Sequence, residues 1–171
     1  MPKALADGNI RVAILATRPA DPNAPTVTEL EAGIDASCRL LKSDYRISAA
    51  ASDTIADAEL CSSTNAQAFG AGNYEGVLTP FRYWDSTDPG KHDTEGDVVF
   101  QALKSKGAVV WVAERATGLT YDTAWAAGQE VNVYELLLDN PTKPSDQGGY
   151  HKVTQVPAVQ NAWEFGTVAT G

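Results

Sequence analysis

The stretch Glu130–Asp139 reads EVNVYELLLD and has the strongest strand character in this chain of 171 residues. Its valine, tyrosine and leucine side chains suit the pleated, buried surface of a β-sheet. A cluster of turn-forming residues follows at Asn140–Gly149 (NPTKPSDQGG), and the chain resumes as Tyr150–Ala158 (YHKVTQVPA) and Gln160–Thr170 (QNAWEFGTVAT). These segments predict long strands joined by a polar turn, a β scaffold that carries no catalytic residues.

Four more segments nearer the N-terminus have strand character: Arg11–Thr17, Ile34–Lys42, Asn73–Trp84 and Ala108–Ala116. Pro80 places the third of them at a sheet edge or a bulge, because proline cannot donate a ladder hydrogen bond. The length and the ordinary share of hydrophobic residues fit a single domain over residues 1–171 with a sizeable core.

Helix signals occur at two places. Thr28 and Glu31 have the spacing of a capping box and Gly33 follows as a stop, which predicts one short helical turn. The second place combines an apolar helical face, basic residues in the last turn and a terminal glycine: Val98, Val99, Ala102, Leu103, Lys104, Lys106 and Gly107. The chain is therefore predicted to be mainly β, within the α+β class, as a β-sandwich or partial barrel with one flanking helix.

The tract Ser43–Gly72 is rich in alanine, serine, aspartate and asparagine and poor in large apolar residues. A loop of this length in a compact domain is usually functional or disordered. Spaced apolar residues along it, such as Ile55 and Phe69, predict a long loop that docks on another surface. Residues 1–10 are weakly patterned and are expected to form an arm that orders against a partner.

The charge balance limits the possible partners. A formal net charge of -9 argues against tight binding of nucleic acid, which needs clustered lysine and arginine. The longest apolar runs are too short to span a bilayer, and the first residues lack the apolar core of a signal peptide, so synthesis inside the cell is expected. Cys38 and Cys61 fit no metal or redox spacing and are expected to be free, buried thiols, although pairing is not forbidden.

No pattern in the chain indicates an enzyme. His92 and His151 are the only histidines, and no GxSxG motif accompanies them. The acidic turn Asp85–Asp97 lacks the order of an EF-hand, and Gly70–Asn73 lacks the lysine of a phosphate-binding loop. We therefore predict no catalytic residue, metal site or cofactor. Four tryptophans and six tyrosines are expected to anchor a core or an interface, with a ligand platform as the alternative.

In order along the chain, five segments resemble the major tail tube proteins of phages with long, non-contractile tails (siphovirus type), in the versions found in actinobacteriophages. They read IDASCRLLKSDYRIS, NYEGVLTPFRYW, GDVVFQALKSKGAVVWVAER, EVNVYELLLDNP and GYHKVTQVPAVQ, and the likeness covers residues 28–170. It implies a protomer that closes into hexameric rings by joining sheets into one inner barrel. The rings stack into a tube that conducts the phage genome.

The resemblance also implies roles for particular residues. Ser43–Gly72 matches the loop that bridges successive rings, and residues 1–10 and Gln160–Gly171 match terminal arms. The expected contact residues of that loop are Asp44, Tyr45, Ile47, Ile55, Leu60 and Phe69. An acidic lumen would let DNA slide without specific binding, and the expected lumen acids are Glu75, Asp85 and Glu135.

The implied partners are further copies of this chain, a tape-measure protein inside the tube, and terminator and distal tail proteins at its ends. The protein would be made in the host cytoplasm and act in the virion tail, without inserting into a membrane. Two alternatives stay open at this point. One is another tail ring protein, such as a terminator or baseplate ring, and the other is a β-sandwich adhesin module that binds carbohydrate.

Overall fold

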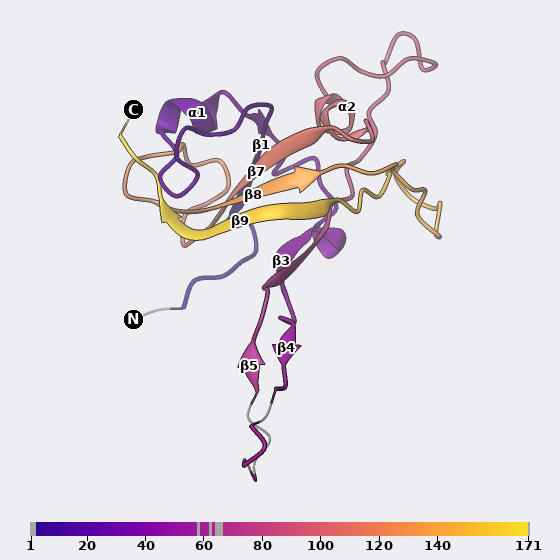
Figure 1. Ribbon diagram of the computed structural model, residues 1–171. Helices are drawn as coiled ribbons and strands as arrows, with labels where there is room; N and C mark the ends of the chain where they lie inside the picture. Colours follow the sequence, from indigo (N-terminus) through magenta and orange to yellow (C-terminus); the bar gives the residue numbers. More distant parts are fainter. Residues whose placement is uncertain (1–2, 58, 62, 64–66, 171) are drawn as a thin grey trace.

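The computed structural model describes residues 3–57, 59–61, 63 and 67–170. A five-stranded antiparallel sheet with the order β2-β1-β7-β8-β9 forms its centre (Figure 1). In chain order its strands are β1 (Ile10–Leu15), β2 (Ile34–Asp35), β7 (Val109–Ala116), β8 (Glu130–Leu137) and β9 (Ala158–Thr167). The mainly β, α+β class predicted from the sequence is confirmed, and the described strands do not close into a barrel.

The remaining elements are short. β3 (Arg46–Ala50) pairs with β6 (Asn73–Val77), and β4 (Thr54–Ile55) pairs with β5 (Ala68–Phe69), both antiparallel. A single turn of 3-10 helix, Lys42–Asp44, precedes β3. The two α-helices are α1 (Val27–Glu31) and α2 (Val98–Leu103).

The central sheet buries apolar side chains on both of its faces, so it is the middle layer of the fold. On one face, side chains such as Val112 and Leu136 pack against α2 and the base of β3 and β6. On the other face, Ala113 and Val133 pack against Leu30 of α1 and other apolar side chains. Because strand residues alternate between faces, β7 and β8 need apolar side chains in both alternating sets, which is why their sequences are almost continuously hydrophobic.

A buried arginine holds the loop that covers the second face. Arg115 on β7 is fully buried, and its guanidinium donates to the backbone oxygens of Thr120 and Ala124 at 2.8 and 3.2 Å. A third bond reaches Oε1 of Gln129 at 3.0 Å, and the ring of Trp125 lies 5.3 Å from the guanidinium carbon. Burial lowers the pKa of Arg115 from its usual value, and the nearby charge of Arg11 adds to this effect.

Three predicted strands differ from the structure. Ile34–Lys42 contains only the two-residue strand β2, and Asn73–Trp84 is a ladder only as far as Val77. Tyr150–Ala158, predicted as a long strand, has isolated bridges, which join Lys152 to Phe81 and Gln155 to Leu78. The segment runs antiparallel to residues 78–82, with backbone bonds between Leu78 and Gln155, from Val153 to Pro80 and from Arg82 to His151. Pro80 has no N–H to donate, so these bonds do not extend into a regular ladder.

The C-terminal segment contains the strand predicted for Gln160–Thr170, since residues 158–167 are the edge strand β9, paired with β8. The role of Gln160–Gly171 as a terminal arm, which the resemblance implies, stays a prediction. Val168 is buried in the second core cluster, which fixes the segment just after the strand. Gly171 lies outside the described residues. The alternating pattern of QNAWEFGTVAT therefore reports a strand of the same protomer.

Helix α1 begins two residues earlier than the spacing of Thr28 and Glu31 predicts. Thr26 is the N-cap: its hydroxyl accepts from the backbone N–H of Glu29 at 3.3 Å, and the Glu29 carboxylate accepts from the N–H of Thr26 at 2.8 Å. The same capping box is therefore present, shifted toward the N-terminus. Bonds from the backbone N–H groups of Ala20 and Thr26 lower the pKa of Glu29.

The two alternatives for this cap predict different effects of two threonine substitutions. Thr26→Ala should lower the free energy of unfolding by about 1 kcal/mol, because it removes the N-cap acceptor. Thr28→Ala should change it by less than about 0.5 kcal/mol, since Thr28 is exposed. Urea denaturation followed by circular dichroism measures both values. Equal losses in the two variants would contradict the observed cap.

Candidate assembly surfaces

The tract Ser43–Gly72 belongs to a two-stranded β-ribbon that projects from the body, and we call residues 46–77 the arm (Figure 1). Its lower part pairs in register from Arg46 opposite Val77 to Ala50 opposite Asn73. Farther out, Asp53 exchanges backbone bonds with the returning strand, to Ala71 and from Gly70 at 3.0 and 2.7 Å. The predicted long loop is thus, in residues 46–55 and 68–77, a ribbon held by its own cross-strand bonds.

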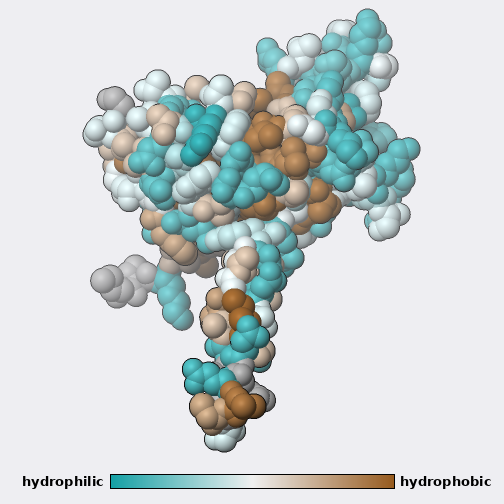
Figure 2. Space-filling model, viewed as in Figure 1, coloured by the Kyte–Doolittle hydropathy of each residue, from teal (hydrophilic) through white to brown (hydrophobic). Residues whose placement is uncertain are grey.

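The outer arm exposes apolar side chains that a single copy leaves in solvent. Leu60 is fully exposed, Phe69 is 86% exposed and Ile55 is 51% exposed. Figure 2 shows brown apolar surface along the outer arm, well separated from the body. Clustered exposed apolar residues of this kind usually mark an interaction site. Beyond Arg46 at its first position, the arm carries charge of one sign, because residues 47–77 contain four acids, Asp53, Asp57, Glu59 and Glu75, and no lysine or arginine.

The base of the arm is fixed to the body. Ile47 is buried in the first core cluster, and the hydroxyl of Tyr45 donates to Oε2 of Glu114 on β7 at 2.7 Å. Burial, together with the Glu114 carboxylate, raises the pKa of Tyr45 well above its usual value. Asp44 accepts a bond from the hydroxyl of Thr79 at 2.7 Å. A rigid base of this kind transmits the position of the sheet to the arm.

The six predicted contact residues therefore separate into two groups. Asp44, Tyr45 and Ile47 belong to the base and make contacts within their own protomer, as described above. Ile55, Leu60 and Phe69 lie on the outer arm and are exposed. In the first group Asp44 and Tyr45 are half-buried and Ile47 is buried, so the second group offers most of the apolar surface that another molecule could contact.

Strand β9 forms one edge of the central sheet. It pairs with β8 on one side, and its sequence AVQNAWEFGT contains no lysine, arginine or proline, the residues that usually block an edge. Its register shifts opposite Asn132 and again between Glu135 and Leu136, which marks two bulges. Phe165 lies in the first bulge with φ of 60° and is 76% exposed. In the sequence, this edge is indicated by the absence of the lysine, arginine and proline residues that usually block an edge strand.

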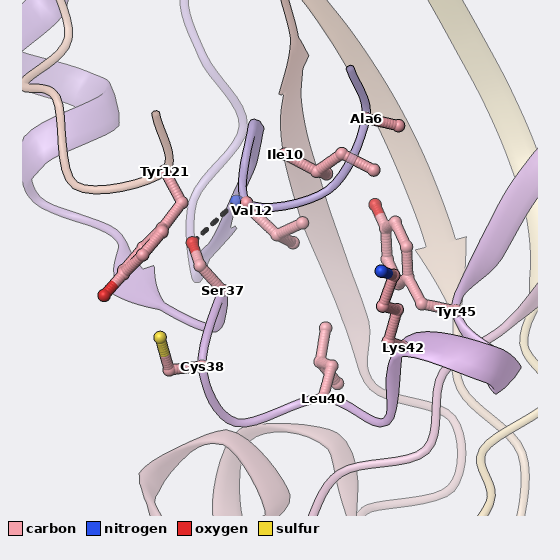
Figure 3. A pocket seen from close by; sticks show the side chains of 10 residues that line it. Ala6, Ile10, Val12, Ser37, Cys38, Leu40, Lys42, Tyr45 and Tyr121 are labelled. Atoms are coloured by element: carbon pink, nitrogen blue, oxygen red, sulfur yellow. Dashed lines mark hydrogen bonds between the residues drawn. The ribbon is translucent and has the colours of Figure 1, made fainter. Parts of the chain in front are cut away.

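A cavity of about 370 Å³ lies between the N-terminal segment, β1 and the 3-10 turn (Figure 3). Its lining is mainly apolar, from residues such as Ile10, Val12 and Leu40, with Lys42 at one side and Tyr121 at the other. The N-terminal segment lies against its own protomer here, because Lys42 forms an ion pair with Asp7.

The cysteines do not behave as predicted. Cys38, at the rim of this cavity, and Cys61, in the outer arm, are both free, but they are exposed where burial was expected. No apolar segment of the described structure covers either cysteine. The neighbouring sequence alone therefore does not decide whether a cysteine is buried.

Among the described residues, no group of three or more histidine, cysteine or acidic side chains has the geometry of a metal site. In the same part of the chain, no helix is long and apolar enough to cross a membrane. The prominent surfaces of this protomer are the arm and the β9 edge, which are suited to contacts between proteins.

A family model described as phage tail tube protein matches residues 1–171, the whole chain. The chain belongs to this family. No curated protein sequence matches it. The tail tube protein is thus a structural component of the phage tail, in agreement with the resemblance found in the sequence.

The three acids predicted for the lumen lie on separate parts of the tail tube protein. Glu75 is exposed on β6 and pairs with Arg46 across the ribbon at 2.8 Å. Asp85 lies in a turn, where bonds from Thr87 and from the backbone N–H of Asp88 lower its pKa. Glu135 is half-buried on β8 and accepts from Nδ2 of Asn161 at 2.6 Å. The protomer does not bring these carboxylates together.

One charged cluster in the tail tube protein is not indicated by the sequence. Asp97, at the end of the acidic turn, is completely buried and receives two bonds from Arg82, at 2.9 and 3.1 Å. Further bonds come from Gln101 and from the backbone N–H of Tyr83 at 2.8 and 3.0 Å. This cluster ties the strand-like segment before the acidic turn to α2.

Proposed function

We propose that this tail tube protein assembles into stacked hexameric rings that form the tail tube, the conduit for genome delivery into the host. The observation that carries the proposal is the projecting arm. Its outer half holds Ile55, Leu60 and Phe69 in solvent on a ribbon with its own hydrogen bonds. Burying such side chains against a neighbour is favourable by about 25 cal/mol for each Å² of apolar surface removed from water.

Ring closure would use the edges of the central sheet. The outer backbone of β9 is engaged at Thr167, whose N–H donates to the oxygen of Asn23 at 3.0 Å, and in the described structure the preceding residues of the strand are open on that side. At the other edge, β2 pairs with Ala13 and Ile14 of β1, and the N–H of Ala36 donates to the oxygen of Val12 at 2.9 Å. Because β9 runs antiparallel to β1, a rotated copy that places its β9 beside this edge continues the antiparallel alternation. Closing the ring removes both edges, which would otherwise be an aggregation hazard.

The charge of the chain fits a conduit for DNA. A protomer with a net charge of -9 repels phosphates, whereas each basic contact would add affinity through counterion release. Glu75, Asp85 and Glu135 remain our proposed lumen acids. Viral DNA would then pass through the tube without specific binding.

The remaining parts of the proposal concern the setting. The protein is made in the host cytoplasm and acts in the tail of a siphovirus-type virion. A tape-measure protein occupies the tube during assembly, and terminator and distal tail proteins close its two ends. The family match supports the tail location, and the resemblance to actinobacteriophage proteins supports these partners.

Sedimentation velocity of the purified protein over a range of concentrations tests the assembly. We expect species larger than a single ring to grow at the expense of smaller ones, with native mass spectrometry finding multiples of the hexamer. A terminator-like protein would stop at one ring, and an adhesin module would stay monomeric and bind glycans saturably. Either behaviour would contradict the proposal.

A further inference from the structure

A pocket of about 290 Å³ lies on the body between residues 82–84 and 143–153. Basic and aromatic side chains dominate its lining: Arg82, Trp84, Lys143, Tyr150, His151 and Lys152. No acidic residue belongs to the lining in the described structure. In a chain with 22 acids and 13 bases, this makes the pocket a distinct basic surface.

The bases of this pocket differ in how much of their charge is available. Arg82 is neutralised by the buried Asp97, and its guanidinium carbon lies 4.8 Å from the ring of Trp84. Lys143 and Lys152 form no ion pair with any described carboxylate, and Nζ of Lys152 donates to the backbone oxygen of Gly148 at 3.1 Å. Arg82 therefore lines the pocket as a neutralised side chain, while Lys143 and Lys152 supply its unpaired positive charge.

The aromatic residues give the pocket an apolar surface next to this charge. The rings of Trp84 and His151 meet edge to face at 6.0 Å, and those of Phe81 and Tyr150 do so at 6.1 Å. Tyr150 is nevertheless 82% exposed and Trp84 is 43% exposed. Exposed aromatic residues beside bases are typical of protein interfaces and fit a peptide that carries both acids and apolar side chains.

We propose that this pocket receives the outer arm of a second copy of the chain. The arm supplies the complementary chemistry, because its outer part carries Asp53, Asp57 and Glu59, no base, and the exposed Leu60 and Phe69. In Figure 1 the arm and the segment around residues 140–150 (light orange) leave the body in different directions, so a protomer does not fill its own pocket. This inference rests on the proposed function, in which arms bridge successive rings.

Two other surfaces are weaker matches for an acidic arm. At the cavity of Figure 3, Lys42 is already paired with Asp7. The exposed apolar residues Val109 and Leu137 lie at the end of the sheet beside Lys106, which pairs with Asp139 at 3.0 Å. Free lysines with exposed aromatic residues distinguish the basic pocket from both.

The natural thiol of Cys61 in the arm allows a direct test. In a Cys38→Ser background, Gln147→Cys places a thiol in the pocket lining, and Val109→Cys places one at the end of the sheet as a matched control. After mild oxidation of assembled protein, we expect disulfide-linked dimers between Cys61 and position 147, identified by peptide mass spectrometry. Linkage to position 109 in place of position 147 would overturn the assignment.

Charge reversal provides the second test. Lys143→Glu with Lys152→Glu should raise the critical concentration for tube assembly about tenfold, because two attractions become repulsions. Lys3→Glu with Lys104→Glu, two exposed lysines that do not line the pocket, is the control with the same change in net charge. Adding Asp57→Lys and Glu59→Lys to the pocket variant should restore assembly, which a merely misfolded variant would not do.

The two tests separate this inference from the proposed function. If arm-shortened protein fails to form tubes while the pocket variant assembles like the wild type, the arm bridges rings elsewhere and only the pocket assignment fails. If arm-shortened protein forms normal tubes, the arm does not bridge rings, and the pocket assignment fails while assembly into tubes stands.

Discussion

Removal of the outer arm is expected to abolish tube formation while the protomer stays folded. Replacing residues 51–72 by an Asn-Gly turn would join Ala50 to Asn73, which are already paired in register. The deleted residues contribute no side chain to either core cluster. We expect the free energy of unfolding to change by less than about 1 kcal/mol, since shortening an exposed segment costs little.

Sedimentation velocity and thermal melting followed by circular dichroism measure the two parts of this prediction. The expected result is a normal melting transition together with single rings or monomers at every concentration. A finer comparison uses Phe69→Ser in the arm and Leu119→Ser on the body, where Leu119 is 39% exposed. Loss of tubes in both point variants, or in neither, would contradict a specific role of the arm.

The position of the cut matters for this experiment. Deleting all of Ser43–Gly72 would also remove Tyr45, with its bond to Glu114, and the buried Ile47. Loss of large buried apolar side chains costs about 2–5 kcal/mol each, so that deletion is expected to unfold the protomer.

Substitution of Asp97 is expected to cause the largest loss of stability of any single change proposed for this protein. Asp97→Ala leaves the guanidinium of Arg82 in a mostly buried site without its partner, since Arg82 has 17% of its side chain exposed. Breaking such a pair by removing one member typically costs about 3–5 kcal/mol. Asp88→Ala, which removes an exposed pair with Lys91, should cost less than about 1 kcal/mol.

Urea denaturation of the two variants at pH 7 provides the comparison. A similar loss in both variants would show that Asp97 contributes no more than a surface carboxylate. Urea denaturation of assembled tubes is a further comparison. Asp97 holds Arg82, which lines the basic pocket, so its loss should also disturb that wall of the pocket.

The pH dependence follows from the same carboxylate. Burial by itself would raise the pKa of Asp97, but the bonds from Arg82, Gln101 and the N–H of Tyr83, together with the Arg82 charge, lower it below 3.8. A lowered pKa in the folded state means that the stabilisation is complete above the unfolded value and is lost as pH falls through the folded value. We expect the free energy of unfolding of the wild type to fall as the pH drops below about 4, because Asp97 becomes protonated. Asp97→Asn cannot titrate at this position, so its free energy of unfolding should fall less from its own value at pH 7.

Strand prediction succeeded where packing follows directly from local sequence. β7 and β8 occupy the middle of the sheet, so both of their faces are buried and their apolar runs report this position. Tyr150–Ala158 lies beside residues 78–82 in one antiparallel register, but the neighbouring Pro80 has no N–H to donate, so isolated bridges form in place of the long strand that was predicted.

The arm illustrates a different limit. In the outer arm, Thr54–Ile55 pairs with Ala68–Phe69 and neither strand packs on a core, so no alternation of apolar and polar residues is needed and none marks these strands. The exposed anchors Leu60 and Phe69 were visible in the sequence as large residues in a small-residue tract. The structure confirms that these side chains are exposed, whereas their role in an interaction surface stays a prediction, and the ribbon itself had no sequence signal.

The charged clusters could not be predicted because their members are distant in sequence. Asp97 meets Arg82, which precedes it by fifteen residues across the acidic turn. Lys143 and Lys152 line the same pocket as Trp84, although they are far from it in the sequence. Local patterns describe caps and turns, whereas such pairings depend on how the loops cross.

Cryo-electron microscopy of the assembled tube, at a resolution that traces the chain, tests the central claim most directly. The account predicts hexameric rings in which the arm of each protomer lies on a copy in the next ring and each β9 edge is paired. A tube whose arms fold back on their own protomers, or purified protein that forms no tube at any concentration, would contradict it.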